Sequence, residues 1–169
     1  NGDIEVTYKS KNRILEEIQA SINRFNEYSD NNIASPDTIE AFLENRDKTL
    51  EIISKGDTYT EIDRKYRNEA KGIGKKLEYF LIGVEDYQNK IDENKKIDKL
   101  SNELIDDKKS VFIEKVTFYK DIEFLKGIEL VDTPGLGSNN NLHTNTSEEF
   151  IKEADVVIIL TDAKEPMQK

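Results

Sequence analysis

The chain has 169 residues, a length that favours one compact domain or a small core with a large insertion. Its 35 acidic and 25 basic residues give a formal net charge of −10, which disfavours nucleic-acid binding through bulk charge. The absence of cysteine excludes disulfides, thiolate zinc sites and cysteine nucleophiles, and it is compatible with a reducing cytoplasm.

The chain begins with a predicted strand and a predicted helix. Polar and apolar residues alternate over 3–9, which is the period-2 pattern of a half-buried strand. From Lys11 the apolar residues recur at helical spacing instead, and this predicts a helix over 11–28. The adjacent acidic residues Glu16 and Glu17 are expected on the solvated face of that helix.

Three more helices are predicted before the character of the sequence changes. Ser35 and Pro36 begin the first of them, because proline at the first helical position gives up only an amide that would be unpaired anyway, and it ends near Gly56. A long apolar stripe over 62–91 predicts the next, where glycines near 72–74 favour a kink or break. A shorter helix follows over 97–105. We therefore predict an α-helical insertion over 11–107, whose role the sequence does not indicate.

The remaining residues predict an α/β pattern. Strands are expected over 111–119, 127–132 and 156–161, with a helix near 146–153 between the last two. The last strand contains the longest apolar run of the chain, Val156–Leu160, which fits a strand buried on both faces. That run is far shorter than the ~20 residues that a membrane-spanning helix needs.

Asp132-Thr133-Pro134-Gly135 is the motif with the clearest chemistry. It places a carboxylate at the end of a predicted buried strand, where α/β sheets bind ligands. In nucleoside-triphosphate hydrolases such an aspartate holds the Mg²⁺ that bridges the terminal phosphates, commonly through water. The four residues alone are also good turn chemistry, so the bare motif leaves a nucleotide site and a simple turn both open.

Two other candidate sites are weaker. The run Gly72-Ile73-Gly74-Lys75-Lys76 lacks the first glycine, the hydroxyl residue and the preceding strand of a phosphate loop, so we interpret it as a helical face. His143 is the only histidine of the sequence, and we expect a surface or loop-packing residue there in preference to a catalytic one.

The stretch from Leu125 to Pro166 carries a longer and more specific pattern. It contains Leu-x-Gly-Ile-x-Leu-Val-Asp-Thr-Pro-Gly-Leu, a His-Thr pair ahead of a short helix, Ala154-Asp155-Val156-Val157-Ile158 and Ala163-Lys164-Glu165-Pro166. This pattern resembles the dynamin-like GTPases, particularly their bacterial branch.

The resemblance implies roles for the motif and a fold around it. Asp132 would contact Mg²⁺ through water at the start of switch II, and the Gly135 amide would reach the γ-phosphate of GTP, with Thr133 and Pro134 in the same nucleotide-binding motif. Residues 1–10 and 108–169 would form part of a P-loop GTPase-like sheet around the insertion 11–107. In that sheet, strand 111–119 would pair antiparallel with strand 127–132, and 3–9 would be a further edge strand.

The chain also departs from the pattern of that family. It contains no Gly-x-x-x-x-Gly-Lys-Ser/Thr phosphate loop, and the switch I threonine and the base-reading motif would lie outside Asn1–Lys169. We therefore expect the middle of a GTPase domain, cut from a longer protein. The strand that feeds the phosphate loop would lie between 127–132 and 156–161, so either these two strands pair directly or a second copy or a missing segment fills the slot.

Activity, partners and location follow from the resemblance as expectations. The parent protein would bind and hydrolyse GTP with Mg²⁺, self-associate and remodel membranes through regions outside this chain, from the cytoplasm or peripherally at a membrane. This chain alone would hold no catalytic residue and bind no GTP tightly. The alternatives are a non-enzymatic helical module that binds a partner on an α/β scaffold, and a Walker-B ATPase, which shares the aspartate but not the Pro-Gly-Leu that follows.

Overall fold

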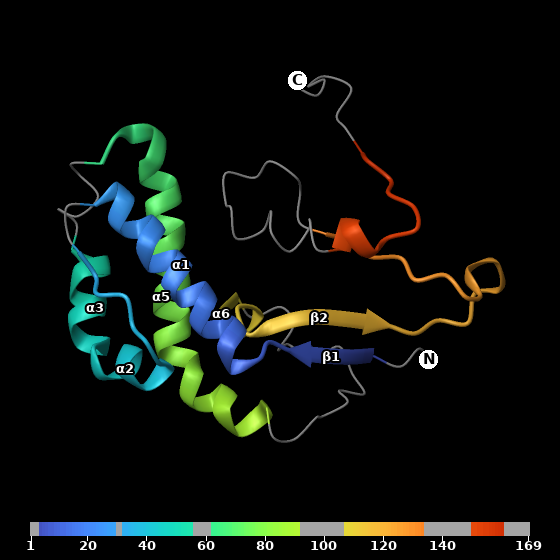
Figure 1. Ribbon diagram of the computed structural model, residues 1–169, viewed down its shortest axis with the longest axis horizontal. Coiled ribbons are helices and arrows are strands. Elements are labelled where there is room, and N and C mark those ends of the chain that lie inside the picture. The colour runs from blue at the N-terminus through green and yellow to red at the C-terminus, as the bar shows by residue number, and fades with distance from the viewer. Residues whose placement is uncertain (1–3, 30–31, 56–61, 92–106, 134–149, 161–169) are drawn as a thin grey trace. The chain divides into compact units, whose positions relative to one another are not determined.

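The computed structural model describes residues 4–29, 32–55, 62–91, 107–133 and 150–160 (Figure 1). The chain divides into two compact units, 1–127 and 128–169. The first unit combines helices with a two-stranded antiparallel sheet, so the coarse expectation of a mixed α and β chain is confirmed.

Two long helices form the centre of the first unit. Helix α1 (Lys11–Tyr28) begins where the periodicity predicts, and the Ser10 hydroxyl caps it by accepting a hydrogen bond from the Arg13 amide at 3.2 Å. Helix α5 (Arg64–Ile91) runs beside it in the opposite direction, as Figure 1 shows. The apolar stripes of both helices are buried against each other, and burial of this area is the main stabilisation of the unit. The fully or nearly fully buried side chains of the pair are Ile14, Ile18, Ile22, Phe25, Ala70, Leu77, Phe80, Leu81 and Val84.

The predicted helix that starts at Ser35 is two helices in the structure. Helix α2 (Ile39–Glu44) is capped by the Thr38 hydroxyl, and helix α3 (Arg46–Ser54) follows after Asn45. The Asn45 side chain donates a hydrogen bond to the Ala41 carbonyl at 2.9 Å, so it satisfies a carbonyl at the end of α2. The periodicity of the sequence could not show this break, because the apolar positions continue at helical spacing through it.

Helix α5 continues through Gly72 and Gly74 without interruption, so no break occurs at 72–74. The interpretation of Gly72–Lys76 as a helical face is therefore confirmed.

The two strands of the first unit lie far apart in sequence. Strand β1 (Ile4–Tyr8) pairs antiparallel with strand β2 (Ile113–Phe118), with Ile4 opposite Phe118 and a register shift between Thr7 and Tyr8. A short helix α6 (Asp107–Ser110) precedes β2. Both strands were predicted. Residues 128–133 form no strand in the described part of the chain, so the expected pairing of 111–119 with 127–132 is not observed there. The partner of β2 is β1, which was expected only as a further edge strand.

The other two predicted strands are not strands in the described residues. Residues 128–133 and 154–160 carry no regular strand, and the large apolar side chains in them are exposed, from 44% for Val131 to 92% for Leu160. A strand needs a hydrogen-bonded neighbour, and in the described ranges the only ladder is the one between β1 and β2. Direct pairing of 127–132 with 156–160 is therefore not observed there.

Some predicted elements fall on positions for which the structure gives no description. The helix over 97–105 and His143 lie outside the described residues, and of the helix near 146–153 only 150–153 is described, as a helix. Among the described helices, none has the length and apolar character required to cross a membrane.

Candidate functional site

The segment that leads to Asp132 begins at a glycine turn. The 3-10 helix η1 (Glu123–Leu125) ends there, and Gly127 has a φ of +77°, in the left-handed region that favours glycine. A Cβ at Gly127 would meet no atom within 4 Å, so the glycine is required by its backbone conformation and not by crowding. The sequence analysis had placed Gly127 at the start of a strand.

Asp132 and Thr133 follow this turn in the second unit. Asp132 is exposed and Thr133 is half-buried, and neither belongs to a helix or a strand. Pro134 and Gly135, the other two residues of the motif, lie outside the described residues. The carboxylate of Asp132 is therefore open to water, as a carboxylate that contacts a hydrated cation needs to be.

The donor set that the structure describes fits Mg²⁺ only in part. A carboxylate and a neighbouring hydroxyl are hard oxygen donors of the kind that Mg²⁺ prefers, and Mg²⁺ commonly uses one or two protein carboxylates together with phosphates and water. Across the described positions, no three acidic or histidine side chains gather into a metal site. Asp132 and Thr133 can therefore supply one side of a magnesium site whose remaining ligands are phosphate and water.

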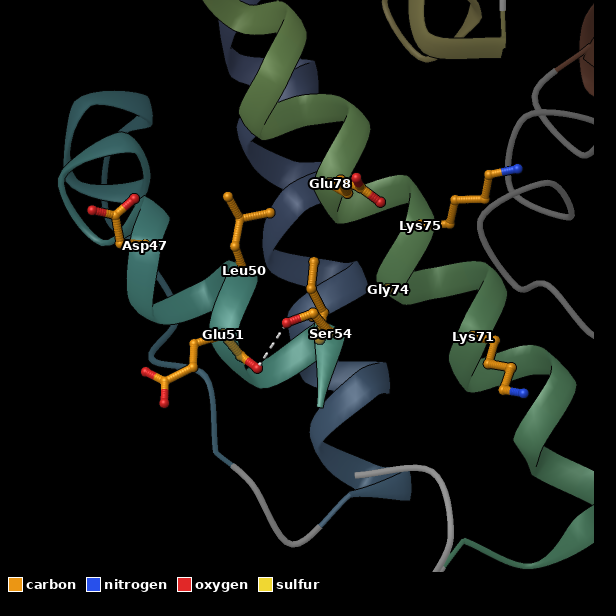
Figure 2. A pocket seen from close by; sticks show the side chains of 9 residues that line it. Asp47, Leu50, Glu51, Ser54, Lys71, Gly74, Lys75 and Glu78 are labelled. Carbon is orange, nitrogen blue, oxygen red and sulfur yellow. Dashed lines mark hydrogen bonds between the residues drawn. The ribbon is translucent and has the colours of Figure 1, made fainter. Parts of the chain in front are cut away.

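A second candidate is a pocket in the helical unit that the sequence analysis did not identify. It is open, has a volume of about 500 Å³ and lies between α3 and α5 (Figure 2). Acidic residues Asp47 and Glu51 come from α3, and Lys71 and Lys75 come from α5. The Ser54 hydroxyl is already engaged, since it donates to the Glu51 carbonyl at 3.2 Å. The lining holds charges of both signs, which suit the binding of a charged or polar partner.

A charged cluster joins the residue after β1 to α1 and α5, and the sequence analysis missed it. Glu17 lies between two ammonium groups, with its carboxylate oxygens 2.8 Å from Lys9 Nζ and 2.8 Å from Lys76 Nζ. The Lys9 ammonium also donates to the carbonyl of Val111 at 3.0 Å. The three side chains are only 13–18% exposed. The expectation of a solvated face is thus wrong for Glu17, whereas it holds for Glu16, which is 66% exposed.

Burial and mutual attraction act in opposite directions on these charges. Burial raises the pKa of Glu17, but the ammonium groups of Lys76 and Lys9 outweigh it, and the pKa of Glu17 falls below its usual 4.5. Burial lowers the pKa of Lys9, and attraction to Glu17 offsets this only partly. The cluster therefore connects the sheet to both long helices with partly desolvated charges. It contains no second carboxylate for acid–base work, so we assign it a structural role.

Comparison with known proteins assigns nearly the whole chain to one family. Residues 3–169 match the model of the Dynamin family. Dynamin-like protein A of Bacillus subtilis (strain 168) is 34% identical over 92 residues, which cover 52% of this chain and 8% of that protein. The chain thus matches only a small part of the length of this relative. No solved structure matches the chain.

Proposed function

Because this chain belongs to the Dynamin family, we propose that it forms part of a GTP-hydrolysing domain in which Asp132 is the switch II carboxylate. The observation that carries the proposal is the exposed Asp132 carboxylate, within the matched region and next to a hydroxyl residue. When bound, Mg²⁺ would supply positive charge that neutralises the charge developing during phosphoryl transfer. Asp132 would hold the water shell of that ion, and Thr133 would lie beside it.

The remaining site residues of the motif have roles that rest on the family resemblance. Pro134 would end the strand that presents Asp132, and the Gly135 amide would donate to the γ-phosphate. Glycine suits this task because it lets the backbone approach a ligand closely. Neither Pro134 nor Gly135 provides a nucleophile or a base, so hydrolysis needs groups beyond these two residues.

The exposed apolar residues near Asp132 support an incomplete sheet. Ile128, Leu130 and Val131 are 44–70% exposed, and Val156–Leu160 are 45–92% exposed, although both sequences favour buried strands. We propose that 127–132 and 156–161 become strands of a P-loop GTPase-like sheet when a further segment pairs with them. That segment would bring the phosphate loop, because these 169 residues contain no Gly-x-x-x-x-Gly-Lys-Ser/Thr motif. The helical region 11–107 would be an insertion in this domain.

The proposal extends to the setting of the parent protein. Family membership supports GTP binding and self-association. Membrane remodelling, through regions outside this chain and from the cytoplasm or the membrane periphery, is the process that such a domain would power. Turnover of GTP that rises on addition of anionic liposomes to the parent protein would support the membrane part of the proposal, and turnover that liposomes leave unchanged would count against it.

A nucleotide titration tests whether the site is incomplete. A fluorescent GTP analogue with Mg²⁺ is titrated into the 169-residue chain, and into a longer native polypeptide that also carries a phosphate loop. The chain alone should bind more weakly than about 1 mM, since Asp132 and Gly135 supply few of the contacts that a nucleotide requires. The longer polypeptide should bind at micromolar concentration and hydrolyse GTP. Micromolar binding by the chain alone would contradict an incomplete site.

A second candidate function is a non-enzymatic module that binds a partner through its helices. It is favoured by the pocket between α3 and α5, which belongs to the helical unit and offers charges of both signs. Hydrolysis of GTP by the parent protein that survives loss of the Asp132 carboxylate would favour this candidate, because Asp-Thr-Pro-Gly would then be only a turn.

A further inference from the structure

One face of α5 is exposed along several turns and carries no covering helix among the described elements. Its members recur every three or four residues, apart from the adjacent positions 71 and 72, and they form a single stripe opposite the buried face. The stripe consists of Lys71, Gly72, Lys75, Tyr79, Ile82 and Asp86. Tyr79 lies at its middle, half-buried, with Lys75 Nζ 5.4 Å from the centre of its ring. Ile82 is 40% exposed, which leaves an apolar patch beside the tyrosine.

Charges are distributed along this stripe in an order that does not stabilise the helix itself. The exposed Lys71 and Lys75 precede Tyr79, whereas the exposed Asp86 and its neighbour Glu85 follow it. The half-buried Glu78 also precedes Tyr79, but it lines the pocket and is not part of the stripe. The partial charges of a helix favour acidic residues toward its N-terminus and basic residues toward its C-terminus. The observed order is the reverse. An interaction outside α5 is therefore a better explanation for the order than the stability of α5.

Such an order is complementary to itself when two copies run antiparallel. Around a twofold axis at Tyr79, a residue before Tyr79 faces the residue equally far after it in the other copy. Lys71 is eight residues before Tyr79, and Asp86 is seven residues after it. At ~1.5 Å rise per residue these two positions differ by only about 1.5 Å along the axis. Lys75 and Ile82 match in the same way, four residues before and three after.

We propose that a second copy of this chain docks antiparallel on this stripe of α5. Tyr79 packs on its counterpart at the axis, the stem of Lys75 covers Ile82, and the ammonium groups face the carboxylates of Glu85 and Asp86. Gly72 favours close approach, because nothing lies within 4 Å of the position that a Cβ would take there. Lys71 and Lys75 also line the pocket with Asp47 and Glu51. The side chain of Lys75 nevertheless extends from α5 away from α3 (Figure 2).

The size of the stripe limits the strength of the association. Stable dimers bury about 800 Å² per partner, and six residues of one helix provide less. The association is therefore transient, and salt weakens it because the ion pairs lie at the surface. The stripe is thus a surface for self-association that does not depend on GTP. The test therefore uses the chain without nucleotide, and its result stands apart from the nucleotide titration.

Charge exchange between two variants tests the proposal with the full 169-residue chain. The acidic variant carries Lys71→Glu and Lys75→Glu, and the basic variant carries Glu85→Lys and Asp86→Lys. Each variant alone should associate about tenfold more weakly than the wild type, because like charges then face each other. An equimolar mixture should associate at least as strongly as the wild type, since one stripe is then all acidic and the other all basic. Sedimentation velocity at low and high salt measures each case.

A matched variant separates this surface from a general effect of charge. Lys11→Glu with Lys48→Glu reverses two lysines that are also exposed but lie on α1 and α3, and it should associate like the wild type. Circular dichroism verifies that every variant keeps its helices. A monomeric wild type at low salt would overturn the proposal and leave the stripe to a different partner. A mixture that fails to recover association would overturn it as well.

Discussion

The aromatic ring of Phe112 lies against Gly83 of α5 in the place that a side chain at position 83 would need. A Cβ on Gly83 would come closer to the ring atoms of Phe112 than real Cβ atoms approach other atoms. The same ring stacks on Tyr87, with 4.7 Å between ring centres, and meets Phe80 edge to face at 5.6 Å. A glycine inside a helix thus lets the turn before β2 pack onto α5.

Replacing Gly83 with alanine should therefore destabilise the helical unit. Alanine favours a helix by about 1 kcal/mol over glycine, but overpacking of a fixed aromatic ring costs about 1–3 kcal/mol. The matched control is Gly72→Ala in the same helix, where the added methyl group meets no atom within 4 Å and should stabilise by about 1 kcal/mol. Urea denaturation followed by circular dichroism at 222 nm measures both. Equal stabilisation by the two alanines would show that Phe112 yields to the methyl group.

Removing the charge of Glu17 should also destabilise the unit. Glu17→Gln leaves the ammonium groups of Lys9 and Lys76 partly desolvated without their counter-charge, which should lower the free energy of unfolding by about 2–3 kcal/mol. The loss is smaller than for fully buried charges because the three side chains keep some exposure. Glu16→Gln is the control, since Glu16 is 66% exposed and its carboxylate makes a long ion pair of 3.9 Å with Arg13 Nη1. This substitution should change stability by less than about 0.5 kcal/mol. The same denaturation measurement applies. A change for Glu17→Gln as small as that for Glu16→Gln would refute the desolvated cluster.

The lowered pKa of Glu17 predicts a loss of stability in acid. A carboxyl group whose pKa is lower in the folded protein stabilises it above the unfolded value and loses this effect as the pH falls through the folded pKa. The free energy of unfolding of the wild type should therefore fall below about pH 4.5 more steeply than that of Glu17→Gln. Parallel acid profiles of the two proteins would contradict the direction of the pKa shift.

Tyr87 predicts a transition in alkali. Burial raises the pKa of its hydroxyl to about 12, with further contributions from Glu114 and Tyr8. A raised tyrosine pKa stabilises the folded protein below the ordinary value of 10, and this effect is lost as the pH rises from 10 to about 12. Among the described residues its buried hydroxyl has no hydrogen-bond partner. Tyr87→Phe should therefore fold equally well at pH 7 and unfold at a higher pH than the wild type. A large loss of stability at pH 7 would show that the hydroxyl is satisfied after all.

Local signals in the sequence predicted the helices better than the sheet. The range 11–28 follows from a repeating apolar stripe, which is a property of neighbouring residues. The partner of β2 does not follow from such a local signal, because Ile4 and Phe118 are more than a hundred residues apart. The alternation over 111–119 does not indicate which strand lies beside it. The segments 127–132 and 156–161 carry the composition of strands, but composition supplies no neighbour to bond with.

The candidate site shows the same division. Asp132 was proposed as a site residue from its motif, because residue types at fixed spacing are visible in a sequence. Glu17 was assigned to a solvated face beside Glu16, since only the packing of α1 against β1 and α5 distinguishes the two. The pocket between α3 and α5 could not be predicted either, because it depends on how two helices meet.

The most direct test of the proposed function is GTP hydrolysis by the parent protein with Asp132→Ala. If Asp132 holds the water shell of Mg²⁺, turnover should fall by about 100-fold or more while the helices stay intact, because an exposed carboxylate is not part of the core. Asp155→Ala is the matched control, as this aspartate is also exposed and lies in the same unit, and it should retain near-normal turnover. Near-normal turnover in a folded Asp132→Ala protein would contradict the assignment of Asp132 to the GTP site.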